Sequence, residues 1–154
     1  MNSERLAALL LGLFILLVPF YAESWGSDWQ EYGKTRHATH YYDAENIVQV
    51  SKNTLRVWEK KSYSPEGVES WVKDVDEKFQ ELDYSILLCE INCVERKMKV
   101  LQSTEYRKNS SVIHFSGEIQ WQHIIPESIG EWFLNGVCKG HAENKGSLPK
   151  NRFP

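Results

Sequence analysis

The sequence predicts an α+β domain in which strands, one inserted helix, further strands and a final helix follow one another. Three patterns carry this prediction. Residues 54–60 alternate strictly between two sets of side chains, as in a half-buried strand. Between Val68 and Leu82, apolar residues recur at intervals of three, four and seven, as on one side of an amphipathic helix. A second apolar side within residues 126–139 predicts the C-terminal helix.

The first 24 residues have the three parts of a secretory signal peptide. A short start with one basic side chain precedes an apolar stretch at residues 6–20, and Ala22 and Ser24 supply small residues at the −3 and −1 positions of a cut. The alternative is an uncleaved anchor, but the apolar stretch is shorter than the roughly 20 residues that span a bilayer. No cysteine lies near the cut, so a lipid anchor is not expected. We expect export to the periplasm, the cell surface or the medium, with no stable membrane span after cleavage.

The rest of the chain is long enough for one domain with a single core. The net charge of the full chain is −3, and acidic and basic residues are interspersed. The absence of a basic stripe gives nucleic-acid binding little support. We expect the folded domain at residues 25–140 and a mobile polar tail at residues 141–154.

Three strands are expected before the inserted helix, at residues 37–43, 47–50 and 54–60. In the third, Leu55 and Val57 face one way, and the opposite face carries Arg56, Trp58 and Lys60. That outer row is either an aromatic–cation recognition surface or an ordinary solvated sheet face with a packed tryptophan.

The inserted helix is expected to begin at Ser64 and Pro65, an N-cap residue followed by proline in the first turn. It should run for about 15 residues and pack on the core. Its predicted apolar side consists of Val68, Trp71, Val72, Val75, Phe79 and Leu82.

The remaining strands are expected at residues 84–94, 96–106 and 111–117, and the first of them contains two cysteines. Cys89 and Cys93 share a face but lie about 13 Å apart along a strand, whereas a disulfide needs Cα atoms within about 7 Å. Cys138 lies in the last turn of the final helix, which Gly140 is placed to end. Cys138 is therefore left to pair with one of the two strand cysteines or with neither.

Several features together resemble the bacterial surface-adhesin protein E family, over about residues 27–139. The features are Trp58 at the end of an alternating strand, Glu90-Ile91-Asn92-Cys93, Arg96, Tyr106, Trp121-x-x-Ile124-x-Pro126-x-Ser128 and Val137-Cys138. The resemblance implies a curved antiparallel sheet of about six strands, with the C-terminal helix held on its concave face by a Cys93–Cys138 disulfide. It also implies a surface protein that binds host matrix and serum proteins and is able to form a homodimer.

The chain departs from the family pattern at three points. It lacks the lipid-anchor cysteine of the named adhesin, it has Asn92 where an aspartate is usual, and Cys89 is an additional cysteine. An unpaired cysteine in an exported protein is either a buried inert thiol or an intermolecular link. Since Cys89 belongs to the inward face, we expect the buried thiol.

The residues predict neither a catalytic site, nor a cofactor, nor a metal site. His37 and His40 are spaced so that a strand sends them to opposite faces, and no second ligand pair follows at metal spacing. Ser128 lies in the first turn of the predicted final helix, where its hydroxyl can accept a hydrogen bond from the free backbone N–H groups. We therefore predict an exported, non-enzymatic binding module that recognises an unidentified protein. The alternative is a periplasmic small-ligand carrier or small enzyme that uses the concave side of the sheet.

Overall fold

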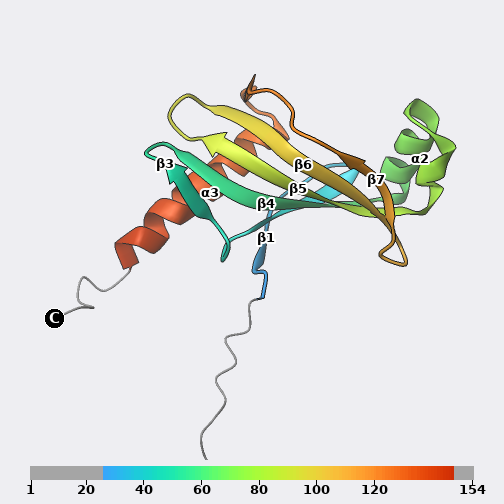
Figure 1. Cartoon of the computed structure of the whole chain (residues 1–154), viewed down its shortest axis with the longest axis horizontal. Coiled ribbons are helices and arrows are strands. Elements are labelled where there is room, and N and C mark those ends of the chain that lie inside the picture. The colour runs from blue at the N-terminus through green and yellow to red at the C-terminus, as the bar shows by residue number, and fades with distance from the viewer. Residues whose placement is uncertain (1–25, 148–154) are drawn as a thin grey trace, which may run out of the picture.

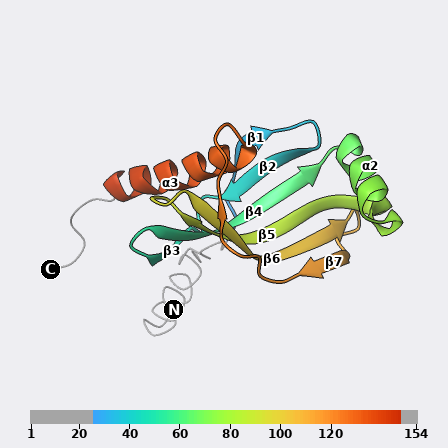
Figure 2. The ribbon, with the colours of Figure 1, turned by 90° about the horizontal axis from the view of Figure 1, so that it is seen from above.

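The computed structural model describes residues 26–147, and for residues 143–147 it describes the backbone alone. The predicted signal peptide therefore lies outside the described residues, as does the end of the predicted tail. Figure 1 shows one sheet with helix α3 toward one end and helix α2 toward the other. The view from above in Figure 2 gives the same arrangement.

The described part of the chain forms a single antiparallel sheet of eight strands. They are β1 (Trp29–Lys34), β2 (Ala38–Asp43), β3 (Val48–Ser51), β4 (Thr54–Tyr63), β5 (Leu82–Asn92), β6 (Lys97–Arg107), β7 (Val112–Ser116) and β8 (Gln122–His123). Six of them follow the order β1-β2-β4-β5-β6-β7, while β3 also pairs with β4 and β8 also pairs with β6. The predicted α+β class with an antiparallel sheet of about six strands is confirmed.

The alternation in β4 separates two faces of the sheet, as predicted. Leu55 and Val57 are buried on the face that α3 covers, which we call the inner face. Arg56, Trp58 and Lys60 lie on the opposite, outer face and are half-buried. The inner apolar residues of β4 and β5 pack against α3 in one core. This core contains Leu55, Val57, Leu87, Cys89, Ile91, Ile124, Phe133, Leu134 and Val137.

Strand β1 was not predicted, because its sequence does not alternate cleanly. Its pairing with β2 shifts register between Glu31 and Gly33, so a bulge at Tyr32 breaks the two-residue period. Tyr32 turns to the inner face, where its ring stacks on Phe133 with centroids 4.9 Å apart.

The inserted helix is shorter than predicted. Helix α2 (Pro65–Asp74) starts as expected, with the Ser64 hydroxyl accepting the N–H of Gly67, but it ends at Val75. Asp76 then accepts the N–H of Lys78 and begins a 3-10 helix, η1 (Glu77–Glu81). Because α2 ends here and η1 begins as a separate helix, Val75 is 60% exposed rather than part of one continuous apolar side.

The final helix begins later and ends later than predicted. Helix α3 (Ile129–Ser147) starts after Ser128, whose hydroxyl accepts the N–H of Glu131, and it continues through Gly140. No described glycine has positive φ, so Gly140 is not a helix terminator here. A side chain at Gly140 would instead lie 3.3 Å from the Tyr42 hydroxyl, so the glycine lets the helix approach β2 closely. The first seven residues of the predicted tail are therefore helical.

Candidate functional site

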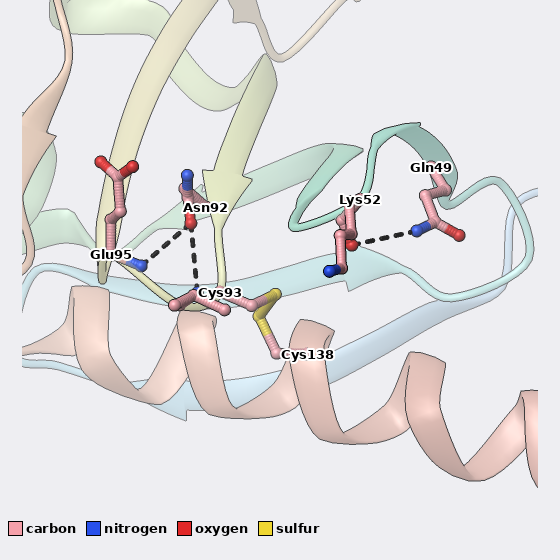
Figure 3. The surroundings of a disulfide bond; sticks show 7 residues. Gln49, Lys52, Asn92, Cys93, Glu95 and Cys138 are labelled. Atoms are coloured by element: carbon pink, nitrogen blue, oxygen red, sulfur yellow. Dashed lines mark hydrogen bonds between the residues drawn. A yellow bond between two sulfur atoms is a disulfide. The ribbon is translucent and has the colours of Figure 1, made fainter.

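A disulfide between Cys93 and Cys138 ties the end of β5 to α3. The two Cα atoms are 6.0 Å apart, and the bond closes a sequence separation of 45 residues. Figure 3 shows Asn92 beside it, with its side-chain oxygen accepting the N–H groups of Val94 and Glu95 over 3.1 and 2.9 Å. The helix is thus covalently fixed to the sheet beside a hydrogen-bonded turn, with the pairing that the family resemblance implied.

Cys89 is a free cysteine and is completely buried in the inner-face core. Burial, together with the nearby charge of Glu59, raises the pKa of its thiol well above the ordinary value. A buried thiol that resists ionisation is a poor nucleophile. This environment favours the inert thiol over the intermolecular link.

The three residues predicted as a binding row lie in line on the outer face, and each has a neighbour there. Arg56 donates to Glu90 through two nitrogens, over 2.7 and 3.1 Å. Lys60 Nζ lies 4.9 Å from the ring centroid of Tyr84. Trp58 borders an open groove of about 510 Å³, whose other apolar walls are Trp29, Val48 and Ile86.

The outer face carries a connected set of cationic and aromatic groups. Lys99 lies 3.4 Å from Glu90 and 3.0 Å from Glu118, and its ammonium is 5.3 Å from the Trp121 ring. Burial raises the pKa of Glu90, but the hydrogen bond from Arg56 and the charge of Lys99 outweigh it, so the pKa lies below its ordinary value. Glu90 is therefore held ionised between two cations.

Sequence reasoning missed a polar cluster on the inner face, which we define as Tyr32, His40, Glu59, Lys61 and Cys89. Glu59 is at its centre and is only 2% exposed. Its Oε1 accepts from the Tyr32 hydroxyl over 2.5 Å and lies 3.6 Å from His40 Nδ1 and 3.7 Å from Lys61 Nζ. Burial raises the pKa of Glu59, but the charge of Lys61, the nearby His40 and the hydrogen bond from Tyr32 outweigh it and hold the pKa low.

Beyond this cluster, the inner face opens into a cavity of about 320 Å³ between the sheet and the α2–η1 segment, which we call the inner cavity. Polar groups of three central strands and of β7 line one side. They are Lys61, Tyr63, Ser85, Ser103, Glu105 and His114. Trp71 and Phe79 of the α2–η1 segment form much of the apolar wall, with ring centroids 4.7 Å apart. Helix α3 places Phe133 in the core and leaves Trp132 47% exposed, and no described residue of α3 lines this cavity.

The histidines do not converge on a metal-ligand geometry. His37 is exposed before β2, whereas His40 is buried in the polar cluster. Among residues 26–147, no group of three or more histidine, cysteine, aspartate or glutamate side chains is arranged to hold a metal ion. In the same range, no helix is long and apolar enough to cross a membrane.

The fold and the disulfide define an α+β domain in which a C-terminal helix is tethered to an open antiparallel sheet. Residues 29–139 match the family model described as surface-adhesin protein E, so the chain belongs to that family. No curated protein and no solved structure gave a significant match.

Proposed function

We propose that the protein is exported and acts as a non-enzymatic binding module that recognises another protein through the outer face of its sheet. The predicted signal peptide and the membership of a surface-adhesin family support a location at the bacterial envelope or cell surface. A homodimer is compatible with the same proposal.

The observation that supports this proposal is that the outer face of the sheet is not covered by α2 or α3 and carries aromatic, arginine and exposed apolar side chains. Helices α2 and α3 pack on the inner side, through contacts such as Trp71 with Tyr63 and Phe133 with Tyr32. Aromatic residues and arginine are enriched at protein interfaces, and the outer face presents both along β4, β5 and β6. Its edges add exposed apolar side chains: Val48 is 55%, Phe115 60% and Trp121 40% exposed.

Trp58 is the residue whose loss should weaken recognition most. It lies centrally, between Arg56 and Lys60, and it borders the groove with Trp29. Buried aromatic and arginine anchors carry much of the binding energy at interfaces, often 2 kcal/mol or more each.

The test is quantitative binding of the mature domain to immobilised host matrix and serum proteins and to envelope extracts. We expect Trp58→Ala to weaken the binding of any captured protein by about thirtyfold, which corresponds to 2 kcal/mol. Trp132→Ala is the matched control, because it removes a partly exposed tryptophan from α3. The proposal fails if nothing is captured, or if both variants weaken binding equally while circular dichroism shows that both are folded.

The small-ligand carrier remains a second candidate because of one observation, the inner cavity with its convergent polar groups. Its volume is at the lower end of the range for small-molecule sites. The two candidates use opposite faces of the sheet, so variants on one face do not test the other.

A further inference from the structure

We propose that the inner cavity is a binding site for a small organic amine, with an apolar body on the α2–η1 wall and an ammonium group at Glu105. The site is independent of the outer-face recognition proposed above. Glu105 is the one carboxylate that lines the cavity, and the described residues leave it incompletely paired.

Glu105 is buried, at 4% exposure, and it lines the inner cavity from β6. Its Oε1 accepts from the Ser103 hydroxyl over 2.6 Å. Its Oε2 is also buried but has no hydrogen-bond partner in the described part of the chain. Leaving a buried charged acceptor without a donor is costly. A ligand in the cavity that donates an N–H to this atom would remove that cost, after a side-chain rotation that turns Oε2 to the cavity.

Neither lysine of the cavity lining is paired with Glu105. Lys61 is the cationic group on the sheet side, and it lies 3.7 Å from Glu59, which offsets its charge. Lys78 lines the opposite wall, where its ammonium lies 5.2 Å from the ring centroid of Phe79. Among the described residues, no cation forms an ion pair with Glu105 within 4.0 Å. An ammonium group would therefore find an available carboxylate.

The apolar wall formed by the α2–η1 segment determines which apolar body the ligand can have. Trp71 and Phe79 present aromatic surface to the cavity, and Ile119 and Val100 extend the apolar lining toward β6. Aromatic faces also attract ammonium groups. A cavity of about 320 Å³ fits a compact amine with one ring or a short hydrocarbon chain better than a large ligand.

The amine group is tested by titrating the mature domain with three compounds that share one body: phenethylamine, 2-phenylethanol and 3-phenylpropionate. Calorimetry measures affinity, and amide chemical shifts locate the site. We expect phenethylamine to bind at least tenfold more tightly than the alcohol, since hydrogen bonds to charged groups are the stronger class. The propionate should bind more weakly than either compound. Shifts should concentrate at Ser103, Glu105 and Ile119 rather than at Trp58.

Two variants test separately the contribution of the Glu105 carboxylate and that of the cavity volume to amine binding. Glu105→Gln keeps the shape of the side chain and should weaken phenethylamine binding at least tenfold, with little effect on the alcohol. Ser116→Phe fills part of the lining and should weaken both compounds while leaving Glu105 in place. Glu77→Gln is the matched control, because this exposed carboxylate of η1 does not line the cavity.

The proposal is overturned if wild type binds no phenethylamine at millimolar concentration, or if Glu105→Gln and Glu77→Gln bind it equally. If Glu105→Gln does not fold, Ser116→Phe and the shift map decide in the same way. Unchanged amine binding in Ser116→Phe, or shifts confined to the outer face, would refute the site. Binding to matrix or serum proteins should not change in any of these variants, so failure here leaves the outer-face proposal standing.

Discussion

Glu59 is the residue on which the polar contacts of the inner face converge. It is buried yet ionised, because Lys61, the Tyr32 hydroxyl that donates to it and the nearby His40 ring compensate for its lost hydration. A carboxyl whose pKa is lower in the folded state than in the unfolded state binds a proton less readily when folded. Its contribution to stability is complete above the unfolded pKa of about 4.3 and is lost as the pH falls through the lower, folded pKa.

Replacing Glu59 with glutamine should therefore change both the size and the pH dependence of stability. We expect Glu59→Gln to lower the free energy of unfolding by about 2 kcal/mol at pH 7, because Lys61 loses its buried partner. Between pH 7 and pH 3, the variant should lose less stability than wild type. Urea unfolding at several pH values measures both effects. Equal pH dependence of wild type and Glu59→Gln would contradict the assignment, and Glu77→Gln controls for the loss of an exposed charge.

The position of helix α2 depends on the absence of a side chain at Gly67. A methyl group there would lie 2.1 Å from the carbonyl oxygen of His37, a backbone atom before β2. The Ser64 N–H donates to the same oxygen over 2.9 Å, so the helix start is already held in place at this point. The helix has to shift before any larger residue fits.

Gly67→Ala should destabilise the protein although alanine is the better helix former. Helix propensity favours alanine by about 1 kcal/mol, but overpacking against backbone costs about 1–3 kcal/mol and occasionally more. We expect a net loss of about 2 kcal/mol in the free energy of unfolding, measured by chemical denaturation. Gly117→Ala is the control: a methyl group there meets nothing within 4 Å, and stability should change by less than about 0.5 kcal/mol. A stabilised Gly67→Ala variant would show that the contact is not restrictive.

A strand with one continuously buried face is predicted clearly from its sequence. Strand β4 alternates because Leu55 and Val57 contact the core while its other face is solvated. Strand β1 could not be predicted because its bulge breaks that period. The end of α3 could not be predicted either. From the local sequence Gly140 predicts a helix end, but its role depends on Tyr42, which is far away in the sequence.

The polar part of the inner face could not be predicted from the sequence for a related reason. Lys61, Ser85 and Glu105 each continue the inward alternation of their own strand, beyond the last inward apolar residue of that strand. Within one strand, a single inward polar residue carries little information. Their common level follows from the register of β4, β5 and β6, which pairs Lys61 with Ser85 and Ser85 with Glu105. Comparing the inward positions of all three strands is the signal that could have revealed the cavity.

At the scale of the whole molecule, the two ends of the inner face are built differently. Under α3 the face is apolar and tightly packed, and the Cys93–Cys138 bond fixes the helix to it. Near α2 the same strands carry polar side chains around the inner cavity, and the contacts there are noncovalent. Stability is thus concentrated at one end and the candidate ligand site at the other, while the outer face spans both.

Removing the disulfide should cost much of the net stability of a domain this small. Closing a loop of 45 residues restricts the unfolded chain by about 4 kcal/mol in the chain-entropy model, and the net stability of a domain is about 5–15 kcal/mol. We expect Cys138→Ala to lower the free energy of unfolding by about 2–4 kcal/mol, measured by urea unfolding. The Cys93→Ala/Cys138→Ala double variant should lose no more than either single variant, because all three lack the same bond.

Which cysteines are bonded, and whether that bond stabilises the fold, can be measured separately. Non-reduced peptide mapping should recover Cys93 linked to Cys138, with Cys89 as a free thiol that reacts with iodoacetamide only after unfolding. Cys89→Ala should keep the linkage and lose about 1 kcal/mol, the cost of a small core truncation. If reduction instead destabilised Cys138→Ala as much as wild type, another bond would be responsible for the stabilisation. If outer-face binding survives in Cys138→Ala under conditions where it is folded, the disulfide supports the fold and takes no direct part in recognition.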